Sequence, residues 1–219
     1  MIILKNIFLG YNKEYYALYD INLTIKDGER VAIVGEDGCG KTALLRIIAG
    51  LDKPQKGEIY IDNTPIQKVD FKSGVSLGYL SSKAVFFESK SVYKNLMWAL
   101  KIRGIDKSLC DKKVCETLNG FGIENLKNEK VGKLCRSDRK LVQIARLALR
   151  NIDILLCDDI DFNEDVKMNE RLNYALRKLV EADNKNKIVI MSCKNFDACK
   201  DLVGRKIALV SGSIDNEWE

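Results

Sequence analysis

The stretch RVAIVGEDGCGKTALLRIIAG, residues 30–50, decides the fold class. It begins with a continuous apolar run at 30–34, which is typical of a strand covered on both faces. It ends with an apolar stripe that predicts a helix over about 41–50, stopped by Gly50. Between the two lies GEDGCGKT, residues 35–42, which matches the pattern G-x-x-x-x-G-K-[ST]. A strand, a glycine-rich loop and a helix in this order predict a phosphate-binding loop.

The residue types of this loop suit the phosphates of a nucleotide. Its glycines allow successive backbone N–H groups to point inward, beside the partial positive charge of a helix N-terminus. The lysine is expected to reach the β- and γ-phosphates, and the threonine hydroxyl to ligate Mg²⁺. The expected nucleotide-binding residues are Gly35, Gly38, Cys39, Gly40, Lys41, Thr42 and Ala43.

A second magnesium ligand is expected at the end of another strand. In IDILLCDDI, residues 152–160, Asp158 follows an apolar run, as the acidic residue of a Walker B strand does. Asp158 and Thr42 are therefore the expected Mg²⁺ ligands.

The rest of the chain alternates strands with helices. Alternation and apolar runs predict strands at 20–26, 57–61, 75–80, 152–157, 187–192 and 206–212, the last followed by an acidic tail. Helical patterns cover about 91–103, 107–119, 137–150 and 165–181. This order predicts an α/β fold with a mainly parallel sheet, into which a helical subdomain at 84–150 is inserted.

Composition removes several classes of function. The chain of 219 residues has no histidine, which excludes imidazole metal sites and histidine-based triads. Seven cysteines without a C-x-x-C pair fit neither a disulfide framework nor a zinc site, and favour a reducing cytosol. A net charge of +5 spread over 67 charged residues gives no reason to expect a nucleic-acid partner. The sequence predicts neither a signal peptide nor a membrane span, so membrane association would come through a partner.

Two long segments carry a resemblance to a known family. GERVAIVGEDGCGKTALLRIIAGLDKPQKGEIYID (28–62) and KLCRSDRKLVQIARLALRNIDILLCDDI (133–160) resemble the nucleotide-binding domain of the ATP-binding-cassette (ABC) family, and the likeness runs over essentially the whole chain. It implies one P-loop NTPase domain of ABC type over 1–219, with an antiparallel β region and 84–150 as its helical subdomain. It also implies ATP and Mg²⁺ as cofactors, with Tyr11 where the family stacks an aromatic ring on adenine.

The same resemblance implies partners. ABC cassettes form head-to-tail dimers, so a second cassette is expected, in a homodimer or a heterodimer. A transmembrane permease subunit is expected as well, with this chain peripheral to the cytoplasmic face of the membrane. Its docking surface would lie near 80–103, where Phe86, Phe87, Tyr93 and Trp98 could form an apolar groove. Packing in the core of the helical subdomain is the commoner use of such side chains.

Several positions depart from the family pattern. Ser82 stands where a glutamine is usual, Asp159 replaces the glutamate that polarises the attacking water, and Cys193 replaces the histidine at the γ-phosphate. The signature L-S-G-G-Q is replaced by LCRSD, which puts Cys135, Arg136 and Ser137 at its centre. Ile160 stands where proline is common. General-base assistance alone typically accelerates a reaction by a factor of about 10² to 10⁴. The sequence therefore predicts an ATP binder that hydrolyses slowly or not at all, with Asp159 as a weak catalytic group.

Two other functions fit less well. A soluble ABC-type regulator or scaffold, not tied to transport, would use the same fold and the same phosphate loop. A small GTPase or a kinase is disfavoured because the chain lacks N-K-x-D, its nearest string being DNKNK at 183–187.

Overall fold

The computed structural model describes residues 1–10, 16–71, 74–161, 165–182 and 186–218. The chain divides into two compact units, and each is described by itself. The first consists of Met1–Ser81, Ile152–Asp161 and Asn184–Glu219, and the second of Ser82–Asn151 and Phe162–Asp183. Among the described residues, no helix has the length and the hydropathy needed to cross a bilayer.

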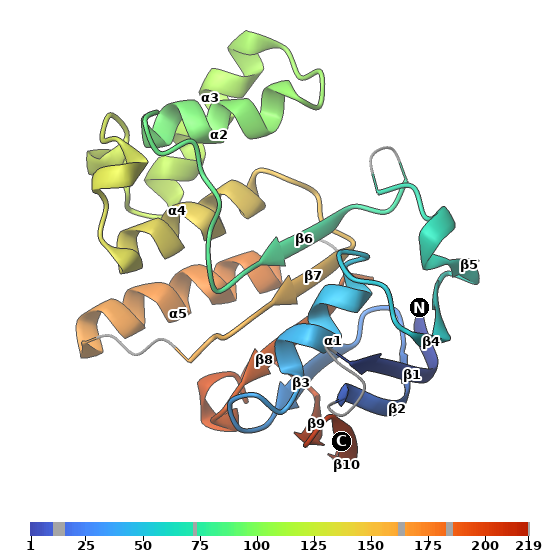
Figure 1. Ribbon diagram of the computed structural model, residues 1–219. Coiled ribbons are helices and arrows are strands. Elements are labelled where there is room, and N and C mark those ends of the chain that lie inside the picture. The colour runs from blue at the N-terminus through green and yellow to red at the C-terminus, as the bar shows by residue number, and fades with distance from the viewer. Residues whose placement is uncertain (11–15, 72–73, 162–164, 183–185, 219) are drawn as a thin grey trace. The chain divides into compact units, whose positions relative to one another are not determined.

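The first unit holds the phosphate loop on a largely parallel sheet (Figure 1). Its strand order is β10-β9-β3-β8-β7-β6, and only the β9–β10 pair is antiparallel. The strands are β3 (Arg30–Val34), β6 (Leu77–Leu80), β7 (Ile154–Cys157), β8 (Ile188–Cys193), β9 (Arg205–Val210) and β10 (Ser213–Trp218). The predicted parallel sheet is thus confirmed, and the carboxyl ends of β3, β7 and β8 lie at the same edge.

A second sheet of the first unit is antiparallel, in the order β2-β1-β4-β5. It is formed by β1 (Ile2–Gly10), β2 (Tyr16–Ile25), β4 (Lys56–Ile61) and β5 (Thr64–Pro65). The pattern did not predict β1, because its alternation changes phase between Leu4 and Ile7, where its pairing with β2 is irregular. Asn6, at φ 48°, lies within this irregularity, so the apolar side chains face the core on both sides of it without following a period of two.

One hydrophobic core joins both sheets of the first unit to helix α1 (Lys41–Ile48). The apolar stripe predicted for this helix is buried, and Leu44 and Ile47 are completely inaccessible. Two short 3₁₀ turns, Ile66–Lys68 and Phe196–Ala198, complete the unit. The start of α1, where the phosphate loop ends, is therefore fixed by the packing of the helix behind it.

The end of the chain contains a hairpin that the sequence did not predict. β9 ends at Val210, and the acidic segment expected as a tail returns antiparallel as β10. The two-residue turn, Ser211 at φ 47° and Gly212 at φ 84°, has the positive φ values that a type I′ hairpin requires. The polar residues of β10 gave no apolar alternation from which to predict a strand. The Ser-Gly pair was the available signal of a hairpin turn.

The second unit is helical. It contains α2 (Val92–Lys101), α3 (Lys107–Gly120), α4 (Arg136–Ala148) and α5 (Val166–Glu181), with 3₁₀ turns at Glu124–Leu126 and Val131–Lys133. The side chains of Ser91, Asp106 and Asp165 cap three of these helices, each accepting a backbone N–H of the first turn. α5 groups with α2–α4 in this unit, and the assignment of 84–150 as the inserted helical subdomain stays a prediction.

Candidate phosphate-binding site

The loop between β3 and α1 requires glycine at two of its positions. Gly40 has a φ of 107°, and a Cβ there would lie 2.3 Å from the carbonyl oxygen of Ala17. A Cβ on Gly35 would lie 2.3 Å from the carbonyl oxygen of Leu209. Gly38 is different, because its φ of 78° favours glycine although the space around it is open. The first unit therefore fixes the path of the loop through backbone contacts.

The N-terminus of α1 keeps its donors available. Gly40 provides no side-chain cap and the first turn carries no acidic residue, so the first N–H groups of the helix have no side-chain acceptor there. Lys41 places its Nζ 2.5 Å from the carbonyl oxygen of Gly35 and 2.8 Å from that of Glu36. Helix donors and an ammonium group thus meet in one concave loop, which is the chemistry that binds phosphate.

Asp158 lies at the centre of a group of hydroxyls below the loop. Its carboxylate accepts hydrogen bonds from Thr42 Oγ1, at 3.0 and 3.1 Å, and from Ser192 Oγ at 2.8 Å. The Tyr79 hydroxyl lies 3.4 Å from the same carboxylate. Burial of Tyr79, together with the nearby charge of Asp158, raises the pKa of this phenol well above its usual value, so the hydroxyl remains a donor.

The expected pair of magnesium ligands is therefore brought together. Asp158 is only 2% exposed and Thr42 lies at the surface, so a bound Mg²⁺ would be held by a buried carboxylate and an exposed hydroxyl. Hard oxygen ligands, one carboxylate and one hydroxyl, suit Mg²⁺, which is commonly completed by phosphate oxygens and water.

The residues after Asp158 form a strained turn. Asp159 is exposed and has a φ of 57°, a conformation that aspartate adopts more readily than most non-glycine residues. Its N–H donates to Ser192 Oγ at 2.9 Å. The N–H of Ile160 donates to the Ser192 carbonyl at 3.1 Å, a bond that a proline could not make. Ser192 thus holds the two aspartates through its side chain and Ile160 through its backbone carbonyl.

Cys193 is completely buried at the end of β8. Its Sγ lies 3.7 Å from Cys199 Sγ, and its carbonyl accepts the N–H of Gly35 at 3.2 Å. The contact with Cys199 and the burial both raise the pKa of the Cys193 thiol, which keeps it neutral. The side chain at this position is therefore packed inside the first unit instead of facing solvent.

The residues that replace the family signature belong to the second unit. Cys135 caps α4, and its Sγ lies 3.3 Å from a carboxylate oxygen of Asp138. Arg136 is exposed, whereas Ser137 is only 7% exposed. Ser82 is an exposed residue of the same unit. Tyr11 lies outside the described residues.

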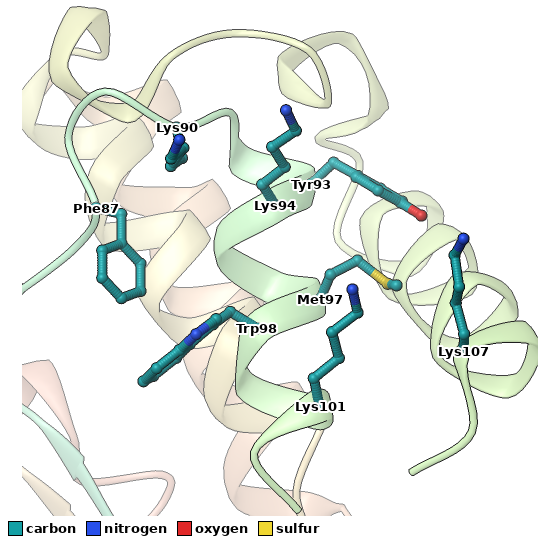
Figure 2. A pocket seen from close by; sticks show the side chains of 8 residues that line it. All are labelled: Phe87, Lys90, Tyr93, Lys94, Met97, Trp98, Lys101 and Lys107. Atoms are coloured by element: carbon teal, nitrogen blue, oxygen red, sulfur yellow. The ribbon is translucent and has the colours of Figure 1, made fainter. Parts of the chain in front are cut away.

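A groove of about 420 Å³ lies on α2 and α3 of the second unit (Figure 2). Its lining combines four lysines with apolar side chains: Phe87, Lys90, Tyr93, Lys94, Met97, Trp98, Lys101 and Lys107. The exposed rings of Phe87 and Trp98 meet edge to face, with centroids 4.9 Å apart. Buried Asn95 fixes the turn that carries Phe87, because its side chain accepts the Phe87 N–H at 2.9 Å and donates to the Phe87 carbonyl at 3.2 Å.

Phe86 does not line this groove, and of the two uses expected from the sequence it takes the core one. The guanidinium of Arg146 lies 4.3 Å from the centroid of its ring, and the ring is only 9% exposed. Arg146 also donates to the carbonyl of Val85 at 2.8 Å. Adjacent residues point in opposite directions here, so Phe86 packs inside the unit while Phe87 reaches the surface.

Sequence patterns missed three residues of the phosphate site. Ser192 and Tyr79 both contact the carboxylate of Asp158, and Lys194 forms an ion pair with Asp37 of the loop. Only their place in the sequence could have indicated these three residues, because each lies in, or shortly after, a predicted strand.

Comparison with known proteins agrees with this geometry. The profile of the family described as ABC transporter matches residues 18–161, which include the phosphate loop and Asp158. The chain belongs to the ABC transporter family. The nickel import system ATP-binding protein of Staphylococcus aureus is 30% identical over 100% of this chain and 90% of its own length. The sn-glycerol-3-phosphate import ATP-binding protein of Bartonella bacilliformis is 33% identical over 80% of this chain.

The ABC cassette also has close structural relatives. The dimeric structure of MJ0796, described as a bacterial ABC transporter cassette, has a TM-score of 0.87 at 30% identity, and covers 100% of this chain and 98% of its own. A structure of the same protein is described as a dimeric post-hydrolysis state bound to ADP and Pi. The chain spans about half the length of several curated relatives that it matches, among them the glycerol-phosphate protein at 51%.

Proposed function

We propose that this chain is the ATP-binding subunit of an ABC-type transporter, binding ATP-Mg²⁺ at residues 35–43 with Asp158 and hydrolysing it slowly or not at all. The observation that carries the proposal is the contact of Thr42 with buried Asp158 directly below a complete phosphate loop. The relatives are named import ATP-binding proteins, which favours import over export.

The proposed weak hydrolysis rests on residues of both units that depart from the family pattern. Asp159 is one methylene shorter than glutamate, so its carboxylate is withdrawn from a water that must lie within about 3 Å of it. The buried, neutral thiol of Cys193 is a poor hydrogen-bond donor to a phosphate. Arg136 and Ser137 carry side chains where the family signature has glycines, and a backbone that must approach phosphate closely tolerates glycine best.

The proposed partners are a second cassette and a transmembrane permease. A dimer is supported by the dimeric structure of the MJ0796 cassette, and either a homodimer or a heterodimer would place each ATP against a partner's signature. The groove of Figure 2 suits a helical segment of the permease that carries both apolar and acidic side chains, because exposed Phe87 and Trp98 lie among four lysines. The chain would then lie at the cytoplasmic face of the membrane through this partner.

Two measurements on the purified chain test the nucleotide part. Titration calorimetry with ATP, with and without Mg²⁺, should show micromolar binding that Lys41→Ala abolishes. Phosphate release should stay well below about 1–10 s⁻¹, an ordinary enzymatic turnover. Turnover in that range would contradict the proposed impairment, and the absence of ATP binding would contradict the proposed function itself.

The partner part is tested by co-expression with a candidate multi-span permease, chosen from any membrane protein whose gene neighbours that of this chain. Lys94→Glu combined with Lys101→Glu reverses two charges of the groove and should abolish co-purification without changing ATP affinity. Lys112→Glu is the matched control, because this exposed lysine of α3 does not line the groove. Equal loss of co-purification in the control would show that the groove is not the docking surface.

A further inference from the structure

The phosphate loop forms an ion pair that neither phosphate binding nor Mg²⁺ ligation requires. Asp37 Oδ2 lies 2.5 Å from Lys194 Nζ, and the two side chains are 80% and 48% exposed. The hydrogen bond from Lys194 lowers the pKa of Asp37, and the same bond raises the pKa of Lys194, so the pair stays charged across the neutral range. Lys194 therefore reaches the loop from another segment of the chain.

The backbone around Lys194 is held beside the loop. β3 and β8 are parallel neighbours, with Val34 opposite Cys193, so the segments that follow them leave the sheet side by side. The carboxylate of Asp161 accepts the N–H groups of Lys194 and Asn195. The preceding side chain, that of Cys193, is turned inward, and this residue contacts the loop only through its backbone carbonyl, whereas Lys194 contacts the loop through its side chain.

The loop carries a net negative charge, which opposes the binding of a polyanion. Glu36 and Asp37 are both exposed, and with Lys41 they give the loop a formal charge of −1. Lys194 brings the group of four side chains to neutrality. Exposed ion pairs contribute only about 0–1 kcal/mol, whereas an ammonium–phosphate contact is charge-assisted and stronger. An incoming phosphate can therefore displace Asp37 from Lys194 at little cost.

We infer that Lys194 is a nucleotide-binding residue, which exchanges the carboxylate of Asp37 for the outermost phosphate of a bound nucleoside triphosphate. A diphosphate, which is one phosphate shorter, leaves Lys194 on Asp37. The pair thus makes the site sensitive to the length of the phosphate chain. This inference rests on the proposed function, since it concerns the same loop.

The affinities of Mg-ATP and Mg-ADP, measured by calorimetry on the full chain, test the inference. Lys194→Ala should weaken ATP binding about tenfold and ADP binding less than about twofold. Lys194→Arg, which keeps a cation, should retain most of the ATP affinity. Lys200→Ala is the matched control, because Lys200 forms a comparable exposed ion pair with Asp197 in the same segment and should leave both affinities unchanged.

A double-mutant cycle separates competition by Asp37 from simple repulsion. Asp37→Asn should tighten ATP binding more than ADP binding when Lys194 is present, and lose this preference in the Lys194→Ala background. An unchanged ratio of ATP to ADP affinity in Lys194→Ala would overturn the inference while leaving the proposed function standing, provided that the wild type binds ATP through Lys41. A wild type that binds neither nucleotide would overturn both.

Discussion

Ser192→Ala is expected to destabilise the first unit, because its hydroxyl bonds both the carboxylate of Asp158 and the backbone N–H of Asp159. Ser192 is completely buried, and its Oγ donates to Asp158 at 2.8 Å while it accepts the N–H of Asp159 at 2.9 Å. Alanine keeps the strand and removes both bonds. The remaining hydroxyl contacts of Asp158 are those of Thr42, at 3.0 and 3.1 Å, and Tyr79, at 3.4 Å.

The two bonds set the expected magnitude. A hydrogen bond to a charged group contributes about 1.5–3 kcal/mol, and Asp158, at 2% exposure, cannot replace the lost donor freely with water. Asp159 is exposed, so water can reach its backbone N–H. The loss of Ser192 Oγ as the acceptor of this N–H therefore adds only about 0.5–1 kcal/mol. The free energy of unfolding should therefore fall by about 2–4 kcal/mol.

Urea unfolding followed by circular dichroism gives this difference directly. Ser213→Ala is the matched control, because the hydroxyl of this β10 residue donates to the Tyr19 carbonyl of β2 at 3.3 Å, and the change should cost less than about 0.5 kcal/mol. Tyr79→Phe tests whether the longer hydrogen bond to Asp158, at 3.4 Å, contributes less to stability than the shorter one from Ser192. This change should cost less than about 1 kcal/mol. The reasoning is refuted if Ser192→Ala costs no more than Ser213→Ala, or if Tyr79→Phe is the more harmful change.

Four further substitutions have distinct outcomes. Gly40→Ala should lower the free energy of unfolding by more than about 3 kcal/mol, whereas Gly38→Ala, with positive φ but open space, should cost about 1–2 kcal/mol; equal losses in thermal unfolding would contradict this difference. Arg146→Ala should cost about 2–4 kcal/mol, because it removes the cation over the Phe86 ring and a backbone hydrogen bond, and a loss below 1 kcal/mol in urea unfolding would argue against it. Asp159→Glu should raise phosphate release at least tenfold, at a strain of about 1 kcal/mol for a longer residue at positive φ; an unchanged rate would assign the impairment to the other departures.

Much of the fold could be predicted from the sequence, because the patterns that indicate its strands and helices are contiguous in the chain. The glycine loop between a buried strand and a helix is a contiguous pattern, and so are the apolar runs of β7 and β8. Three strands that escaped prediction lack such a pattern, and one of them, β5, is only two residues long. β1 changes phase at Asn6, where the pairing shifts, and β10 is too polar to show an apolar face.

The sequence by itself determined the family, the phosphate loop and the acidic residue that would complete a magnesium site, since each is carried by residues close together in the chain. Only the tertiary structure decided which side chains meet there. Parallel pairing of β3 with β8 and of β8 with β7 brings Ser192 against Asp158, turns Cys193 inward and sets Lys194 against Asp37. These contacts join residues that are distant in sequence, and a pattern read along one segment carries no information about which other segment will lie beside it.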